Sequence, residues 1–219
     1  MSDADRCQRA RRVRTLLKKA YPDARTMLDH RNAYELLIAT ILAAQCTDAK
    51  VNEVTRTLFR EYPDPESLAK AKGADVEKTV KPTGFFRQKT KSILGTASGI
   101  VERFGGKVPD NMEDLTSLPG VGRKTANIVL GECFGKPGIV VDTHLKRVTA
   151  RIGLAHEKDP DKIEAELDDV IAEKDRTVFS HVVTFHGRRI CVAAKPRCPE
   201  CVVRPLCDYF ANVFRSAKA

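Results

Sequence analysis

Four cysteines near the C-terminal end constrain this chain more than any other feature of its sequence. Cys191 is followed after six residues by Cys198, after two more by Cys201 and after five more by Cys207. Four thiols within 17 residues are typical of a metal centre, and an odd total of seven cysteines argues against a disulfide framework. Structural zinc usually joins two Cys-x-x-Cys knuckles. This segment has one, so the spacing favours an iron–sulfur cluster held in a single loop.

Charge is distributed unevenly along the chain. Residues 185–204 carry five basic residues and one acid, whereas residues 157–175 carry nine acids and three basic residues. With a net charge of +9, this pattern predicts a positive face directed at a polyanion. The cysteine loop would serve either electron transfer or the presentation of Lys195 and Arg197 to phosphates, and the spacing leaves both uses open.

Apolar residues recur at helical spacing throughout the chain. The clearest single stripe consists of Tyr34, Leu37, Ile38, Ile41 and Leu42. Only residues 138–141 resemble a strand, so we expect an all-α protein with about ten short helices. No apolar run approaches the roughly 20 residues of a membrane span, and the charged N-terminus lacks a secretory signal. We therefore expect a cytoplasmic protein with no membrane partner.

A tight turn, Leu118 through Gly122, separates two helical segments. Gly120 and Gly122 flank the apolar Val121 and let the backbone turn sharply and approach a ligand. The N–H groups of the turn then point outward at a helix N-terminus, which is a ready site for an anion such as a DNA phosphate. A dinucleotide-binding interpretation fails because no strand precedes the glycines. We expect Gly120, Val121 and Gly122 to contact DNA.

Lys124 falls in the first turn of the second helical segment, where a cation opposes the helix dipole. An amine must be neutral to attack carbon, and this position, beside Arg123, disfavours the protonated form. Lys124 is therefore either a nucleophile or a lysine that only touches phosphate, and the local sequence does not choose. Asp142 likewise suits a helix N-cap or a carboxylate that faces a developing positive charge.

Several motifs, spread from about residue 8 to residue 210, together resemble the endonuclease III family of helix-hairpin-helix DNA glycosylases. They are Ala44–Asp48, Thr83–Arg87, Leu118–Leu130, Val141–His144, His186–Arg188 and the four cysteines. The most specific part of the resemblance is the combination of the hairpin, its lysine and the cysteine loop.

The resemblance implies an all-α fold in which two helical domains flank a DNA-binding cleft. Residues 26–136 would form a six-helix barrel that contains the helix-hairpin-helix. Residues 1–25 and 137–219 would form a discontinuous domain that holds a [4Fe–4S] cluster on the four cysteines. The implied partner is duplex DNA with a damaged base or an abasic site. We expect a monomer, because one enzyme acts on one flipped base.

The resemblance also implies a bifunctional DNA glycosylase and abasic-site lyase of base excision repair, acting on oxidised or ring-saturated pyrimidines. Lys124 would attack C1′ of the sugar and form a Schiff base, Asp142 would stabilise the positive charge, and β-elimination would cut the strand. Gln45 would fill the space left by the flipped nucleotide, and Phe85 would act as an apolar wedge. Further DNA contacts would come from Arg87, His144, Lys195 and Arg197.

Two residues depart from the family's pattern near the cysteines. Ala194 stands where a basic residue is common before Lys195, and Arg189 stands where an aromatic residue is common. The alternatives are a monofunctional glycosylase, such as the adenine-removing relatives, and a non-catalytic iron–sulfur protein that binds DNA. The adenine-removing relatives look different at the Lys124 position, and a non-catalytic protein needs no neutralisable lysine there. In a bacterial source we expect the protein to be associated with the nucleoid.

Overall fold

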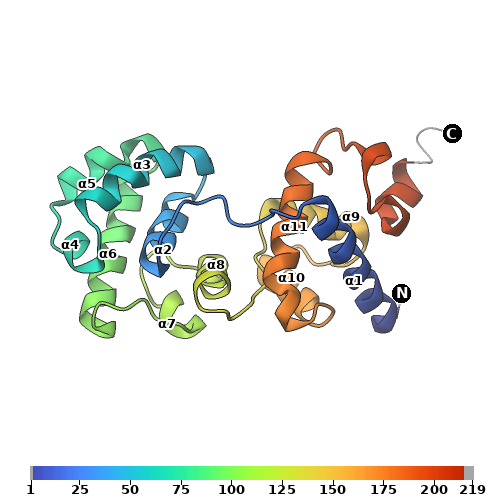
Figure 1. Cartoon of the computed structure of the whole chain (residues 1–219), viewed down its shortest axis with the longest axis horizontal. Helices are drawn as coiled ribbons and strands as arrows, with labels where there is room; N and C mark the ends of the chain where they lie inside the picture. The colour runs from blue at the N-terminus through green and yellow to red at the C-terminus, as the bar shows by residue number, and fades with distance from the viewer. Residues whose placement is uncertain (1, 215–219) are drawn as a thin grey trace. The chain divides into compact units, whose positions relative to one another are not determined.

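The computed structural model describes residues 2–214, and every regular element in that range is a helix (Figure 1). The α-helices are α1 (Asp3–Ala20), α2 (Ala33–Leu42), α3 (Asp48–Glu61), α4 (Pro65–Ala69), α5 (Gly73–Val80), α6 (Phe86–Phe104), α7 (Met112–Thr116), α8 (Arg123–Cys133), α9 (Thr143–Ile152), α10 (Pro160–Asp168) and α11 (Arg176–Arg189). The shorter elements are the 3₁₀ segments η1 (Lys81–Thr83), η2 (Glu173–Asp175), η3 (Cys198–Glu200) and η4 (Arg204–Leu206), and the π-helical η5 (Phe210–Phe214). The all-α prediction is confirmed, and residues 138–141 form no strand. No described helix is both long and apolar enough to cross a membrane.

The chain divides into two compact units, each with its own hydrophobic core. One is Met27–Lys136, which we call the inserted unit. The other, the terminal unit, joins the described residues up to Thr26 to those from Pro137 onward. The boundary between the units after Thr26 lies one residue later than expected. The boundary after Lys136 lies at the expected position.

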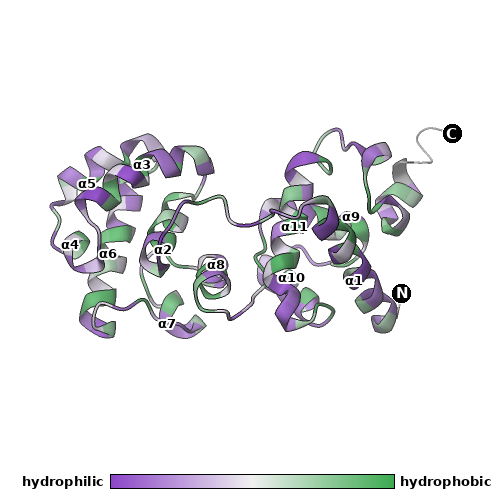
Figure 2. Ribbon diagram, viewed as in Figure 1, coloured by the Kyte–Doolittle hydropathy of each residue, from purple (hydrophilic) through white to green (hydrophobic). Residues whose placement is uncertain are grey.

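Helix α2 forms the centre of the inserted unit. Every residue from Tyr34 to Leu42 is buried, and α3, α6 and α8 pack against the helix. Most of these residues are apolar, and such a helix is stable inside a core because an exposed face would leave apolar surface in water. The buried Glu35 pairs with Arg31. The surrounding helices are amphipathic, and α6 in Figure 2 carries both hydrophobic and hydrophilic residues along one ribbon.

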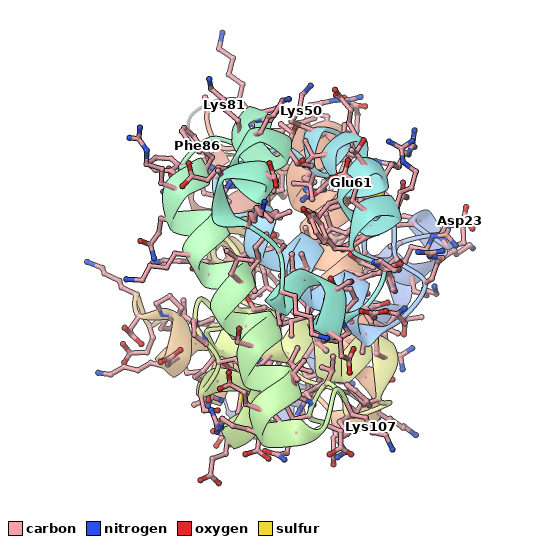
Figure 3. The ribbon with its side chains drawn as sticks, turned by 90° about the vertical axis from the view of Figure 1, so that its left-hand side faces the viewer. Asp23, Lys50, Glu61, Lys81, Phe86 and Lys107 are labelled. Carbon is pink, nitrogen blue, oxygen red and sulfur yellow. The ribbon has the colours of Figure 1, made fainter. Side chains whose placement is uncertain are left out.

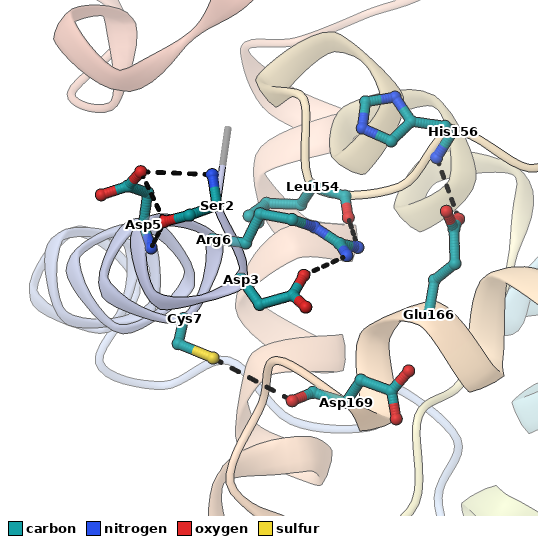
Figure 4. A network of polar contacts seen from close by, with 9 residues as sticks. All are labelled: Ser2, Asp3, Asp5, Arg6, Cys7, Leu154, His156, Glu166 and Asp169. Atoms are coloured by element: carbon teal, nitrogen blue, oxygen red, sulfur yellow. Dashed lines mark hydrogen bonds and ion pairs between the residues drawn. The ribbon is translucent and has the colours of Figure 1, made fainter.

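The core of the terminal unit lies where α11 packs against α1 and α9. Phe179 of α11 is fully buried there. Arginines of α1 fasten that helix to the rest of the unit. Arg6 donates a hydrogen bond to the Leu154 carbonyl at 3.0 Å (Figure 4), and Arg9 pairs with Asp208 at 2.7 Å. Part of the positive charge of α1 is thus used for folding, and the segment after the last cysteine is tied to this helix.

Candidate functional site

The hairpin between α7 and α8 has the backbone that its glycines predict. Gly120 has φ +78°, and a Cβ added there would lie 2.7 Å from the Ser92 Cβ, so only glycine fits. Gly122 is the N-cap of α8, and within the described residues this glycine provides no side-chain cap for the first turn. Such uncapped donors point along the helix axis, which is the arrangement that binds an anion.

The hairpin packs against helix α6. Cβ atoms added at Gly95 and Gly99 would lie 3.0 Å from Pro119 and 2.7 Å from Leu118, so the two glycines make room for the turn. Between them, the Thr96 hydroxyl donates a hydrogen bond to the Pro119 carbonyl at 2.6 Å. The hairpin is therefore fixed on the inner face of a long helix, and its position does not depend on the turn alone.

Lys124 lies in the first turn of α8, as predicted, and its side chain is exposed. The opposite face of α8 is anchored in the core of the inserted unit by Ala126, Val129 and Leu130. The helix is thus held rigidly while the amine faces solvent next to the uncapped N–H groups. This arrangement suits both a nucleophile and a phosphate contact.

Asp142 belongs to the terminal unit and is the N-cap of α9. Its Oδ1 accepts hydrogen bonds from the backbone N–H groups of His144 at 2.9 Å and Leu145 at 2.7 Å. The Thr184 hydroxyl donates to Oδ2 at 3.3 Å. In the local structure, Asp142 therefore caps the N-terminus of α9. Asp142 is half-buried, and its Oδ2 keeps acceptor capacity for a further partner.

Gln45 and Phe85 share a feature that the sequence did not reveal. Within the described residues they are the non-glycine residues with positive φ, at +53° and +47°. Gln45 is exposed in the turn after α2, and Phe85 is 67% exposed immediately before α6. Strained backbone of this kind is uncommon in non-glycine residues and clusters at functional sites. Both side chains belong to the inserted unit.

Basic side chains accompany these two turns. Figure 3 shows Lys50 and Lys81 at the end of the inserted unit where Phe86 begins α6, with Lys107 at the other end of that helix. Arg87 is exposed, and its guanidinium lies 5.3 Å from the Phe86 ring centroid. The end of α6 that carries Phe85 therefore has cations to meet a polyanion.

His144 is more enclosed than a simple DNA contact requires. It is half-buried, and its Nδ1 lies 3.2 Å from Nη2 of Arg147. The same arginine donates hydrogen bonds to the carbonyls of Cys191 at 3.0 Å and Gly187 at 2.9 Å. Arg147 thereby connects α9, α11 and the first cysteine, and it holds His144 in one orientation.

The four cysteines line a single pocket whose other walls are largely apolar, including Val148, Ile152, Ile190 and Val203. Among the described residues, no three His, Cys, Asp or Glu side chains converge closely enough to hold one metal ion. A zinc ion needs sulfurs about 2.3 Å from one point. A cubic cluster takes one thiolate at each iron, so its ligands surround a volume. Four cysteines around one pocket are the donor set that such a cluster takes, with one thiolate for each iron.

Polar groups next to the cysteines suit sulfur ligands. The Arg151 guanidinium lies 3.3 Å from Sγ of Cys191, and Nε2 of His186 lies 3.4 Å from Sγ of Cys201. Burial raises the pKa of the Cys201 thiol to about 11, and the nearby cysteines add to this shift. Four thiolates in this pocket would thus need a positively charged centre to stabilise them.

The two predicted phosphate contacts of the cysteine loop differ in their surroundings. Lys195 is exposed. Arg197 forms a two-pronged ion pair with Glu200, with Nε to Oε1 at 2.8 Å and Nη2 to Oε2. Arg197 would have to share or leave this carboxylate to bind a phosphate, whereas Lys195 needs no such rearrangement.

Some residues at these sites escaped sequence reasoning. Lys89, Ser92 and Thr96 lie on the buried face of α6, and Arg151 contacts the cysteine pocket. Their polar character inside otherwise apolar helical stripes was the available signal. Such a signal does not say what a side chain contacts, because its partners are distant in the sequence.

Both the sequence and the fold of this chain are similar to those of known DNA repair proteins. Residues 38–173 match the model of the HhH-GPD superfamily of base excision DNA repair proteins. The chain is 48% identical to endonuclease III of Synechocystis over 93% of its length and 94% of the relative, and 43% identical to that of Bacillus subtilis over 85% and 86%. A solved structure of a trapped endonuclease III–DNA covalent intermediate has a TM-score of 0.90 at 36% identity, covering 98% of this chain and all of the other.

Proposed function

Because this chain belongs to the endonuclease III family of HhH-GPD base excision DNA repair proteins, we propose that it is a bifunctional DNA glycosylase and abasic-site lyase. Its substrates are oxidised or ring-saturated pyrimidines in duplex DNA. It acts as a monomer in the cytoplasm, at the nucleoid in a bacterial source. The inserted unit, which contains α2 to α8, is its barrel domain with the helix-hairpin-helix, and the terminal unit is its cluster domain.

Lys124 is the nucleophile of this proposal. The lone pair of the neutral amine attacks C1′ of the damaged nucleotide, and the bond from C1′ to the base breaks as the base leaves with its electron pair. The sugar ring then opens to a Schiff base on Lys124. Loss of a C2′ proton breaks the C3′–O bond by β-elimination and cuts the strand. A long amine that is exposed on a rigid helix has the reach for this attack.

Asp142 stabilises the positive charge that develops on the sugar as the base leaves. Its hydrogen bonds to the backbone N–H groups of α9 hold the carboxylate in one orientation. The proposal requires Lys124 and Asp142 to reach the same deoxyribose.

The inserted unit prepares the DNA for this reaction. The hairpin N–H groups bind a phosphate, Phe85 wedges into the base stack, and Gln45 fills the space that the flipped nucleotide leaves. Flipping costs a few kcal/mol and is easiest for a weakly stacked base, which favours ring-saturated pyrimidines. Arg87 and His144 supply further DNA contacts.

Cys191, Cys198, Cys201 and Cys207 hold a [4Fe–4S] cluster. When bound, the cluster supplies a rigid cross-link for the loop and a one-electron redox centre. The residues between the cysteines carry Lys195 and Arg197, so a loop held in one conformation presents these cations to phosphates. The apolar pocket excludes water from the thiolates, and Arg151 offsets part of their charge.

The observation that carries the proposal is the exposed Lys124 beside the uncapped N–H groups of the hairpin. A non-catalytic iron–sulfur protein that binds DNA needs only the hairpin and the cations. A monofunctional glycosylase needs no amine that forms a Schiff base.

Borohydride trapping on duplex DNA that contains a thymine glycol tests the proposal. We expect wild type and Lys107→Gln to form a covalent adduct, and Lys124→Gln to bind DNA without forming one. Lys107 is a matched control because it is exposed, lies in the same unit and is far from Phe86 along α6. No adduct from folded wild type on either thymine glycol or abasic duplex would exclude lyase chemistry. An adduct on the abasic duplex alone would indicate a different lesion.

A further inference from the structure

Lys89 of α6 is buried, although lysine is among the residues least often found inside proteins. Only 5% of the residue is exposed. Loss of water lowers the pKa of its ammonium group, and the neighbouring Cys46 thiol partly opposes this effect. Removing an ammonium group from water costs free energy, so a buried lysine is expected to have a structural or functional role. The proposed function does not assign a role to Lys89.

The side chain of Lys89 ends at the turn before α6. Its Nζ donates a hydrogen bond to the Thr83 carbonyl at 2.7 Å. Thr83 is itself 2% exposed, and its hydroxyl donates to the Val80 carbonyl at 2.8 Å. The carbonyl that precedes Gly84 is therefore fixed inside the protein by a charged donor, which gives a strong hydrogen bond.

The backbone of Lys89 makes a second contact with the same turn. Its N–H donates to the Phe85 carbonyl at 3.1 Å. One residue thus holds the carbonyls on both sides of Gly84, at Thr83 and at Phe85. Between these two fixed points the chain passes through two residues with positive φ, +71° at Gly84 and +47° at Phe85, and Phe85 is left-handed.

The left-handed conformation of Phe85 needs such restraint. Outside glycine this conformation is strained, and it persists only where the surrounding structure enforces it. Freed from the Thr83 contact, the turn would relax toward ordinary backbone angles and the exposed ring would point elsewhere. The orientation of the wedge therefore depends on Lys89, which does not itself reach the surface.

We propose that Lys89 is a positioning residue that holds Phe85 in the orientation needed to enter the DNA base stack. This inference rests on the proposed function, since it assigns Phe85 the role of wedge. Lys89 touches neither DNA nor the reacting atoms, and it acts through the turn from Thr83 to Phe85.

Two substrates separate positioning from general loss of structure. A thymine glycol must be unstacked before it is removed, whereas a preformed abasic site has no base to unstack. We expect Lys89→Met to excise thymine glycol about 10- to 100-fold more slowly than wild type, since a displacement of about 1 Å can cost 10²-fold. Trapping on the abasic duplex should stay at the wild-type rate. An equal loss on both substrates would overturn the inference and make Lys89 a purely structural residue.

A matched control and a second readout complete the test. Thr90 is buried on the same helix, and its hydroxyl has no hydrogen-bond partner among the residues that the structure describes. Thr90→Val should therefore keep the wild-type ratio of the two rates. Unstacking is measured without chemistry by the fluorescence of 2-aminopurine placed opposite the lesion. At saturating protein, Lys89→Met should give the weak signal of Phe85→Ala, and adding Lys89→Met to Phe85→Ala should change nothing more. A further loss in the double variant would contradict the inference.

The fluorescence also separates this inference from the proposed lyase chemistry. If wild type unstacks the base and Lys89→Met does not, but neither is trapped, Lys89 positions the wedge and the lyase proposal fails. If trapping proceeds and the fluorescence of the two proteins is equal, the lyase proposal stands and the inference fails. If Lys89→Met does not fold, Lys89→Leu, which also lacks a donor for the Thr83 carbonyl, provides the same comparison.

Discussion

The glycines of the hairpin meet two different physical requirements. Gly120 lies in the left-handed region and against Ser92, so a side chain there is excluded both by backbone angle and by contact. Gly122 has φ −98°, and a Cβ added there would meet nothing within 4 Å. Packing therefore does not require glycine at this position. Binding does, because the missing side chain lets a phosphate approach the first turn of α8.

Gly120→Ala should therefore destabilise the fold more than Gly122→Ala. We expect Gly120→Ala to lower the free energy of unfolding by about 2–4 kcal/mol, combining left-handed strain with overpacking against Ser92. Gly122→Ala replaces a fair N-cap with a poor one and should cost about 1 kcal/mol. Denaturant unfolding of the three proteins measures both values. Equal losses would show that the contact with Ser92 relaxes at little cost.

At the scale of elements, α6 organises the inserted unit. Phe85 directly precedes α6, and Lys89 of this helix binds the Thr83 carbonyl in the turn before it. Further along α6, the hairpin packs against Gly95, Thr96 and Gly99. Phe85 and the hairpin are thus positioned by the same helix. Helix α9 has a comparable role in the terminal unit, because Asp142 both begins the helix and presents a carboxylate.

Two substitutions separate these roles of Asp142. Asp142→Ala removes the cap of α9 and should lower the free energy of unfolding by about 0.5–2 kcal/mol, whereas Asp142→Asn keeps a good cap and should cost little. If the charge stabilises the transition state, single-turnover excision should fall by about 10²- to 10³-fold in both variants. Wild-type excision by a fully stable Asp142→Asn variant would reduce Asp142 to a helix cap.

At the scale of the whole molecule, the net charge of +9 is not spread evenly. Arginines of α1 are used in ion pairs and hydrogen bonds inside the terminal unit, and Arg197 is paired with Glu200. Fewer cations are therefore available to DNA than the composition suggests. In the function proposed here, the hairpin and the exposed Lys195 supply part of a limited set of phosphate contacts.

The salt dependence of the DNA association constant measures how many phosphates the protein contacts. With about five phosphates neutralised, the logarithm of the DNA association constant should fall with the logarithm of salt concentration at a slope of about −4 to −5. Lys195→Gln should make the slope shallower by about 1. Fluorescence anisotropy titrations across a range of salt concentrations measure both. A wild-type slope shallower than about −2 would contradict a directed positive face.

The fold class and the places of the main motifs could be predicted from the sequence. Helical spacing of apolar residues, the glycines of the hairpin and the close spacing of four cysteines are local patterns. Each has one dominant physical interpretation, so α2, the start of α8 near Lys124 and the absence of strands in the described residues follow from them. The roles of Lys124 and Asp142 needed the family resemblance as well, because one residue type in one turn serves several purposes.

Only the tertiary structure decided which polar side chains meet. The bond from Lys89 to the Thr83 carbonyl, the seat of the hairpin between Gly95 and Gly99, and the pairing of Arg197 with Glu200 are properties of packing. The left-handed backbone of Gln45 and Phe85 belongs to the same class. Neither residue type favours this conformation, and it exists because neighbouring helices hold the chain on both sides. Local sequence sets which helices form, and packing between distant residues sets the conformation of the turns that join them.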